Sequence, residues 1–242
     1  MKRYSFDKPL IEGIMIKRNS QFTATVVVGE ESFVAHIPTT NRIGDVENKN
    51  LPCLLSFHPE ETRKLHYDIE AVLLSNDDNW VGINQILSNK LVEFFLRTHQ
   101  LDEIVSSDDI HREVKLGNSK LDFKVGNTYL EVKTPLTEIQ VKYGKNVKTI
   151  KQSPFSSTSR MQKHVNELAE SLKEHERAIF LEVLQYKVTQ PKQRLHSTHY
   201  EEVKATVEEA LTKGVEFYKI ELDFKPDGVS IHKIYRTIFN EK

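Results

Sequence analysis

The stretch that decides the fold is HREVKLGNSKLDFKVGNTYLEVKTP, from His111 to Pro135. It contains two Gly-Asn pairs, at positions 117–118 and 126–127, and each lies between runs that alternate apolar and charged residues. Alternation with a period of two is typical of strands, and a Gly-Asn pair suits a two-residue hairpin loop of type II′, which requires glycine first. The stretch therefore predicts three neighbouring antiparallel strands.

Counting back from each predicted loop gives the register of these strands. Glu113 is then opposite Asp122, and Asp122 is opposite Glu131. Lys133 lies on the same face, opposite Lys120. The other face carries an apolar set that we expect to point into the core: Val114, Leu121, Phe123, Leu130 and Val132. The pattern predicts a row of three carboxylates across one face, provided that both loops have two residues.

Such a row is unfavourable by itself, because like charges opposite one another destabilise strand pairing and raise each other's pKa. A divalent cation reverses the sign of this effect, since Mg²⁺ and similar ions take carboxylate and water oxygens as ligands. Asp122 and Glu131 are therefore predicted ligands of Mg²⁺ or Mn²⁺. A neighbouring lysine such as Lys133 could hold the attacking water or clamp a phosphate. The alternative, a solvated strand face without a metal, remains open.

Length and composition bound the rest. The chain has 242 residues, 38% of them hydrophobic and 29% charged, with a net charge of −1, so any nucleic-acid surface must be local. The single cysteine, Cys53, excludes an internal disulfide framework and a cysteine-clustered zinc site. The first residues lack the apolar core of a signal peptide, and no apolar run approaches the roughly 18 residues of a membrane span. We expect a soluble, cytoplasmic protein with no membrane partner; the oligomeric state stays open, a homodimer included.

Two domains are expected. Five short runs rich in Val, Ile, Phe and Tyr between residues 10 and 75 are typical of a small barrel or sandwich. The polar tract Ser75–Asn79 then breaks the pattern, which predicts domains at 1–78 and 79–242. In the second, INQILSNKLVEFFLRTH has the spacing of a helix, and another helix begins near Thr158 or Ser159. A buried strand over 178–186, a helix ending before Gly214 and two closing strands complete an α/β pattern.

The strand motif also resembles known proteins. Asp122, Glu131 and Lys133 match the D…(D/E)-x-K core of the restriction-endonuclease-like, or PD-(D/E)XK, nuclease fold. The segment KLDFKVGNTYLEVKTPL resembles the RIDF…YVEVKS segment of the sugar fermentation stimulation protein family (SfsA-like). Four further segments resemble that family in the same order along most of the chain: FVAHIPTTNRIGDV, GINQILSNKLV, TSRMQKHVNEL and EEALTKGVEFYKIEL.

The resemblance implies an N-terminal OB-fold-like β-barrel followed by a restriction-endonuclease-like mixed-sheet domain with flanking helices. It also implies DNA binding and a role in regulating sugar-utilisation genes. The nuclease fold would assign Asp122 and Glu131 as metal ligands, Lys133 as the catalytic lysine, Gln162 as an accessory polar residue and Glu113 as an extra carboxylate. The chain departs from the family at Thr39 and Asn41, and it has PFSS where the family has FPDA, which removes an acidic residue near the site.

Candidate nucleic-acid contacts come from two places. From Val141 to His164 there is no acidic residue and there are six basic ones: Lys142, Lys145, Lys148, Lys151, Arg160 and Lys163. Such local patches contact phosphates without reading sequence. His164 is a further candidate for a phosphate contact. On the barrel, where OB-folds bind single strands by stacking and by basic grooves, the candidates are Arg18, Phe22, Arg42 and Phe57.

Two functions follow from these residues, and the sequence leaves both open. The first is a DNA-binding regulator that carries an idle metal-capable site. The second is a Mg²⁺-dependent nuclease or phosphodiesterase that acts on nucleic acid. A sensor of a small ligand at the domain interface is a third, weaker reading. The sequence does not separate single-stranded from double-stranded DNA as the partner.

Overall fold

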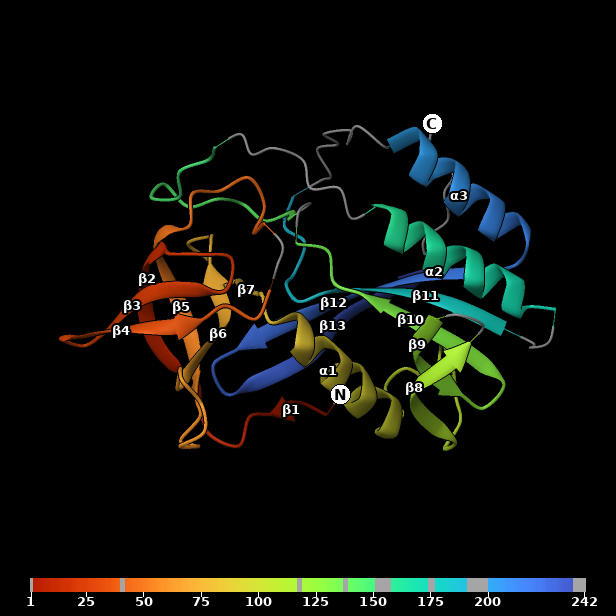
Figure 1. The fold of residues 1–242 in the computed structure, drawn as a ribbon, viewed down its shortest axis with the longest axis horizontal. Coiled ribbons are helices and arrows are strands. Elements are labelled where there is room, and N and C mark those ends of the chain that lie inside the picture. Colours follow the sequence, from red (N-terminus) through yellow and green to blue (C-terminus); the bar gives the residue numbers. More distant parts are fainter. Residues whose placement is uncertain are drawn as a thin grey trace.

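The described part of the chain forms two sheets and three helices (Figure 1). The structure is a computed structural model, and it describes residues 2–39, 42–116, 119–136, 139–150, 158–173, 177–190 and 200–236, with side chains left out at 158–160 and 200. None of the helices in these ranges is long and apolar enough to cross a membrane.

The first sheet is the small barrel expected from the sequence. Its strand order is β4-β3-β2-β5-β6-β7, and a parallel pairing of β4 with β6 closes it. The strands are β2 (Ile11–Arg18), β3 (Thr23–Val28), β4 (Glu31–His36), β5 (Lys49–Phe57), β6 (Tyr67–Leu73) and β7 (Trp80–Gly82). The closure rests on one residue pair, His36 with Asp68.

The second sheet has seven strands in the order β1-β13-β12-β11-β10-β9-β8. They are β1 (Tyr4–Ser5), β8 (Ile110–Leu116), β9 (Ser119–Val125), β10 (Thr128–Lys133), β11 (Arg177–Leu184), β12 (Glu216–Lys225) and β13 (Gly228–Arg236). The strands β10, β11 and β12 run parallel, and the remaining pairs are antiparallel. The mixed sheet predicted for the second domain is thus present, with β1 from the N-terminus added at its edge.

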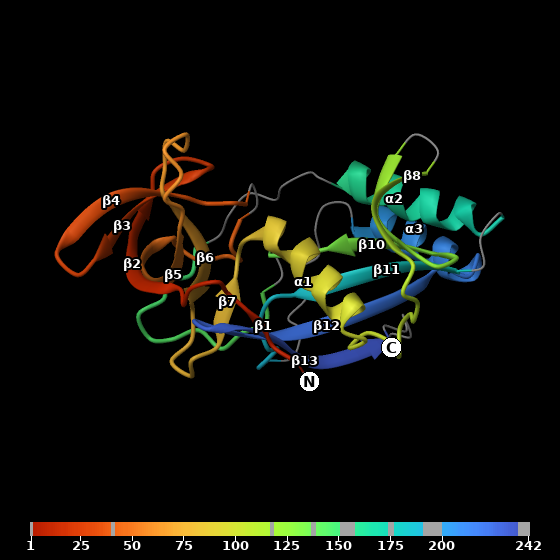
Figure 2. The ribbon, with the colours of Figure 1, turned by 90° about the horizontal axis from the view of Figure 1, so that it is seen from below.

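Helices cover both faces of this sheet. Helix α1 (Gln85–Arg97) lies on one face, and α2 (Thr158–Ser171) and α3 (Tyr200–Thr212) lie side by side on the other (Figures 1 and 2). This explains why β11 reads as a nearly continuous apolar run, since a strand covered on both faces has no solvent side. Asn84 caps α1 by accepting hydrogen bonds from the backbone N–H groups of Ile86 and Leu87.

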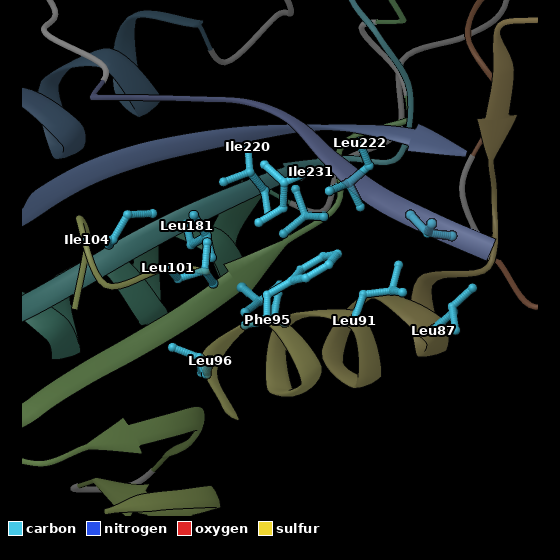
Figure 3. Close-up of a cluster of buried hydrophobic side chains, with 14 of the residues drawn as sticks. Leu87, Leu91, Phe95, Leu96, Leu101, Ile104, Leu181, Ile220, Leu222 and Ile231 are labelled. Atoms are coloured by element: carbon cyan, nitrogen blue, oxygen red, sulfur yellow. The ribbon is translucent and has the colours of Figure 1, made fainter. Parts of the chain in front are cut away.

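The apolar stripe of α1 builds the largest core cluster. Leu91 and Phe95 are fully buried against Leu181, Ile220 and other residues of the central strands (Figure 3). A second cluster fills the barrel, and a third lies between the sheet and the pair α2 and α3. Because alternate residues of each central strand enter different clusters, the side chains of β10 that do not face α1 point toward α2.

The predicted register of the three-stranded stretch is confirmed for the pairs next to both predicted loops, but Glu113–Asp122 and Asp122–Glu131 are not among the paired residues. The pairs Leu130–Phe123 and Tyr129–Lys124 join β10 to β9, and Val114–Leu121 and Leu116–Ser119 join β9 to β8. Gly126 has a φ of +55°, as the first loop position of a type II′ turn requires. The other loop, 117–118, lies outside the described residues.

The expectation of one continuous core face for this stretch is wrong. Phe123, with Leu130 and Val132, joins the cluster under α1, but Leu121 and Val114 pack with α2 and α3. Residues two apart on a regular strand share a face, so β9 must twist sharply between Leu121 and Phe123. Glu113, opposite this point on β8, has a φ of +54°, which is rare for a residue other than glycine. The strands β9 and β8, at one edge of the sheet, accordingly curve away from the other strands (Figure 2).

Candidate functional site

The site begins where β9 separates from β10. The ladder between these strands ends at the Leu130–Phe123 pair, and the next backbone donor of β10, the N–H of Val132, bonds instead to Asp122 Oδ2 at 2.8 Å. Asn89 of α1 donates from Nδ2 to Asp122 Oδ1, also at 2.8 Å. The sharp twist of β9 thus turns the Asp122 carboxylate into the gap between the strands, with both oxygens held.

The pKa of Asp122 is raised above its ordinary value. Burial is the main cause, and the negative charge of Glu131 adds to it. The hydrogen bonds from Val132 and Asn89 and the charge of Lys133 oppose the rise without cancelling it. The two carboxylates therefore interact as like charges, as the sequence pattern predicted, and a bound cation would relieve this repulsion.

Glu131 is the buried centre of the site, with only 1% of its surface exposed. Its Oε1 is bound by Lys133 Nζ and by His164 Nδ1, and these two nitrogens lie 3.5 Å apart. Its Oε2 is also buried but has no hydrogen-bond partner among the described residues. A buried carboxylate oxygen without a partner is costly, so this atom calls for a donor or a cation that the described part of the chain does not supply.

The residues present fit a hard divalent cation. Asp122 and Glu131 offer carboxylate oxygens, which Mg²⁺ and Mn²⁺ prefer, and Glu131 Oε2 is the available one. Asn89 and the Val132 N–H hold Asp122 in the manner of groups that orient metal ligands from behind. A cation bound here would supply charge neutralisation at a phosphate and activation of water.

Glu113 does not join these two carboxylates. It lies at the bend of β8, its side chain is 61% exposed, and it pairs with Lys120. The pKa of Glu113 is lowered by the hydrogen bond from Lys120 and by its charge. The predicted row of three carboxylates therefore consists of two in the structure, because the bend rotates the third away.

Gln162 also lies apart from the carboxylates. Its Nε2 donates to Thr206 Oγ1 at 3.2 Å and so links α2 to α3. His164, two residues further along α2, is the residue that enters the site: it is 7% exposed and contacts Glu131. Its assignment as a phosphate contact stays a prediction, and its observed partner is the carboxylate.

The lysines of the basic stretch lie on the barrel. The segment after β10 crosses from the sheet to the barrel, where it makes backbone hydrogen bonds with Gly44, Glu47 and Leu74. Its apolar residue Val141 enters the barrel core. Three basic side chains of this segment are left exposed: Lys142, Lys145 and Lys148. The described lysines of this segment therefore lie along the barrel, and α2 carries the exposed Lys163, which lies 3.9 Å from Glu167.

The two arginines proposed for the barrel make internal contacts. The Arg18 guanidinium donates to the carbonyls of Gln21 at 2.5 Å and Thr39 at 3.1 Å, and burial lowers its pKa. Arg42 is 15% exposed and pairs with Asp45 at 3.4 Å. Their assignment to nucleic acid stays a prediction. Lys151 and the side chain of Arg160 lie outside the described residues.

Two contacts of the site were not predicted from the sequence: Asn89 with Asp122, and His164 with Glu131. The contact of Asn89 could not be predicted, because Asn89 flanks the apolar stripe of α1 and its partner, Asp122, is distant in the sequence. The sequence does indicate the orientation of His164: it is three residues after Met161 and four before Leu168, which places it on the apolar stripe of its helix. A histidine in that stripe faces the sheet, not the solvent.

Comparison with known proteins agrees with this architecture. A model described as the SfsA N-terminal OB domain matches residues 16–83, and one described as the sugar fermentation stimulation protein RE domain matches residues 86–228. The chain belongs to the sugar fermentation stimulation protein family. The family resemblance predicted from the sequence and the OB-fold-like nature of the barrel are thereby confirmed.

Members of the family with similar sequences come from several bacteria. A sugar fermentation stimulation protein homolog of Synechococcus sp. (strain JA-2-3B'a(2-13)) is 31% identical over 179 residues, which cover 74% of this chain and 72% of its own. One from Maricaulis maris (strain MCS10) is 29% identical over 239 residues, covering 96% and 97%. The structure of Pyrococcus furiosus SfsA in complex with Ca²⁺ has a TM-score of 0.71 to this chain at 19% identity and covers 97% of each. That likeness shows the fold.

Proposed function

We propose that this protein is a cytoplasmic DNA-binding protein whose second domain holds a Mg²⁺ or Mn²⁺ ion between Asp122 and Glu131. The observation that carries the proposal is Glu131 Oε2, a buried carboxylate oxygen without a partner among the described residues. Lys133 and His164 both contact Glu131 Oε1, but they leave Oε2 without a hydrogen-bond donor. A cation explains both this atom and the close approach of two carboxylates.

DNA is the proposed partner because Lys142, Lys145 and Lys148 are exposed along one segment, although Lys148 also lies 3.8 Å from Glu47. Lys142 and Lys145 project from the segment that joins the metal site to the barrel, and Lys163 lies on α2 beside His164. Such cations bind phosphates with little regard to sequence. The role in regulating sugar-utilisation genes that the family resemblance implies belongs to this proposal.

A metal-dependent nuclease activity is the second candidate, and Lys133 favours it. Its ammonium group lies at Glu131, beside the place where the cation would bind, and its side chain is 30% exposed. From there it could orient a water or stabilise charge on a phosphate. The structure of the Pyrococcus furiosus protein contains Ca²⁺, also a hard cation that prefers oxygen ligands.

The two candidates separate in one experiment. Binding of fluorescent single-stranded and double-stranded DNA is followed by anisotropy, with Mn²⁺ and with EDTA, and the same mixtures are examined for cleavage on gels. Cleavage by wild type that Asp122→Asn and Lys133→Gln abolish while binding persists would establish the nuclease. Binding that survives EDTA, without cleavage, would support the DNA-binding protein without a nuclease activity. Asp77→Asn, at an exposed carboxylate in a turn, is the matched control.

The basic surface is tested by the same anisotropy measurement at several salt concentrations. The double variant Lys142→Gln, Lys145→Gln removes two phosphate contacts and should lower the slope of log affinity against log salt by about 1–2. Lys173→Gln, at an exposed lysine at the end of α2, should leave the slope unchanged. No DNA binding by wild type at low salt would contradict the proposal.

A further inference from the structure

A second group of metal-ligating side chains lies in the barrel, well separated in sequence from the carboxylates of the second domain. Among the described residues, His58, Asp68 and Glu70 offer one ligand atom each within 4.8 Å of one another. Asp68 belongs to the single residue pair with which β4 and β6 close the barrel. The group is therefore at the seam of the barrel.

The two oxygens of Asp68 have different surroundings. Oδ1 accepts from Arg63 Nη2 at 2.6 Å and lies 3.1 Å from His36 Nδ1. Oδ2 lies 3.2 Å from His58 Nε2. Arg63 and His36 thus hold one oxygen in place and leave the other turned toward His58, which is how an orienting shell presents a carboxylate to a metal.

Glu70, unlike Asp68, accepts a side-chain hydrogen bond on each carboxylate oxygen. It is 5% exposed, Asn84 Nδ2 donates to its Oε2 at 2.8 Å, and Ser56 Oγ donates to its Oε1 at 2.6 Å. Burial raises the pKa of Glu70, and the nearby charge of Asp68 adds to the rise. Arg63, which lies on Asp68, provides one positive charge for two carboxylates, so the group has an uncompensated negative charge when both are ionised.

The ring nitrogen of His58 has more acceptors than it can serve. Its Nε2 is 3.0 Å from Ser56 Oγ and 3.2 Å from Asp68 Oδ2. The Ser56 hydroxyl proton is already donated to Glu70, so both atoms are acceptors that compete for one N–H. A catalytic triad is excluded for the same reason, because there the serine and the aspartate use opposite nitrogens of the histidine. Several lone pairs facing one nitrogen are instead what a metal ion organises.

We propose that His58 Nε2, Asp68 Oδ2 and Glu70 Oε1 bind a divalent transition-metal cation of the Zn²⁺ class. One imidazole nitrogen and two carboxylate oxygens form a mixed set that suits Zn²⁺ better than Mg²⁺, which prefers oxygen alone. Zn²⁺ holds its ligands at about 2.0–2.2 Å, so small side-chain rotations bring the three atoms to one ion. Ser56 or water completes the tetrahedral set.

Such an ion would brace the junction between the domains. Glu70 accepts backbone hydrogen bonds from Ile83 at 2.8 Å and Asn84 at 3.4 Å, in addition to the side-chain bond from Asn84. Asn84 is the N-cap of α1, the helix that also carries Asn89 against Asp122. This site is independent of the proposed function, since it shares no residue with the proposed Mg²⁺ or Mn²⁺ site.

The test is a Zn²⁺ titration of metal-free, tag-free protein in competition with a chromophoric chelator. Wild type and Asp122→Asn should each bind one Zn²⁺ that His58→Gln weakens by at least about tenfold. The matched control is His66→Gln, which removes the neighbouring histidine that contacts the carbonyl oxygen of His58. Absence of Zn²⁺ binding by wild type, or equal binding by His58→Gln, would overturn the proposal.

A second measurement needs only wild type and therefore still tests the proposal if His58→Gln folds poorly. In ¹⁵N-histidine spectra of wild type, Zn²⁺ should shift the Nε2 resonance of His58 and leave that of the exposed His99 in place. Shifts confined to histidines other than His58 would overturn the proposal. Because Asp122→Asn removes only the proposed site of the second domain, failure at one site is distinguishable from failure at the other.

Discussion

At the scale of single residues, the site depends on the hydrogen-bond donors and charges that surround Asp122 and Glu131. Burial and the charge of the neighbouring Glu131 raise the pKa of Asp122, and the hydrogen bonds from Val132 and Asn89 and the charge of Lys133 oppose this rise. Glu131 is held on one oxygen and open on the other. The residues that orient the two carboxylates would not themselves touch the proposed cation.

Asn89 offers a direct test of this orientation. Asn89→Ala frees Asp122 Oδ1, and we expect Mn²⁺ affinity measured by calorimetry to fall about 10–100-fold. Lys90→Ala, at the next, exposed position of α1, should leave it unchanged. Equal affinities for the Asn89 variant and wild type would show that Asp122 needs no orienting partner.

A second prediction concerns pH and the pair of Arg177 with Glu216. Burial alone would raise the pKa of Glu216, but the two hydrogen bonds from Arg177, at 2.7 and 3.0 Å, and its charge lower it overall. A lowered pKa in the folded state stabilises the protein above the unfolded value of about 4.3 and ceases to do so as pH falls through the folded value. Glu216→Gln should cost about 1 kcal/mol at pH 7.

The measurement is urea unfolding of both proteins at pH 7 and near pH 3. The difference in unfolding free energy should shrink as pH falls through the folded-state pKa of Glu216, below which this carboxyl is neutral in both states. Glu209→Gln, in an exposed pair with Lys213, should show little effect at either pH. A difference that stays constant with pH would refute the assignment.

At the scale of elements, much of the fold follows from local patterns. Helix α1 follows from its apolar spacing, β11 from its continuous apolar run, and the register of the meander from the two Gly-Asn loops. The bend at Glu113 could not be predicted, because nothing in the residue type indicates a positive φ there. It is set by tertiary packing, which sends Leu121 and Phe123 into different clusters.

The positive φ of Glu113 at the bend of β8 leads to a further prediction. Glu113→Gly removes the left-handed strain of a residue with a side chain, so we expect the melting temperature to stay level or rise by about 1–3 °C. Mn²⁺ affinity should not change, because the Glu113 side chain points to solvent and Lys120. Glu113→Gln, which removes only the charge, is the control. A large loss of Mn²⁺ affinity in both variants would return Glu113 to the metal site.

At the scale of the whole molecule, the domains are joined by more than the chain between them. The N–H of Gly82 in β7 bonds to the carbonyl of Gln185 at 2.8 Å, and the Gln185 side chain bonds to the carbonyl of Asn84 at 2.8 Å and to Ser88 Oγ at 2.9 Å. The strand β1 adds the N-terminus to the sheet of the second domain. Contacts between residues so distant in sequence produce no periodic pattern. The domain boundary predicted near residue 78 therefore could not predict these interdomain hydrogen bonds.

Gly82 tests this junction. A Cβ added there would lie 2.6 Å from Gln185 Cβ and 2.9 Å from Phe224, both fully or almost fully buried. Gly82→Ala should therefore lower the unfolding free energy by roughly 1–3 kcal/mol in urea. Gly29→Asn is the control, because its site is open and asparagine tolerates the φ of +60°. An unchanged stability of Gly82→Ala would mean that the domains are not tightly packed here.

The most direct measurement is calorimetric titration of Mn²⁺ into the His58→Gln protein, with and without DNA, so that the barrel cluster does not contribute. The same titration is made with Asp122→Asn added. We predict one Mn²⁺ site in the first protein, tighter when DNA phosphates complete it, and none in the second. Equal binding by both proteins, or no binding even with DNA, would contradict a cation site between Asp122 and Glu131.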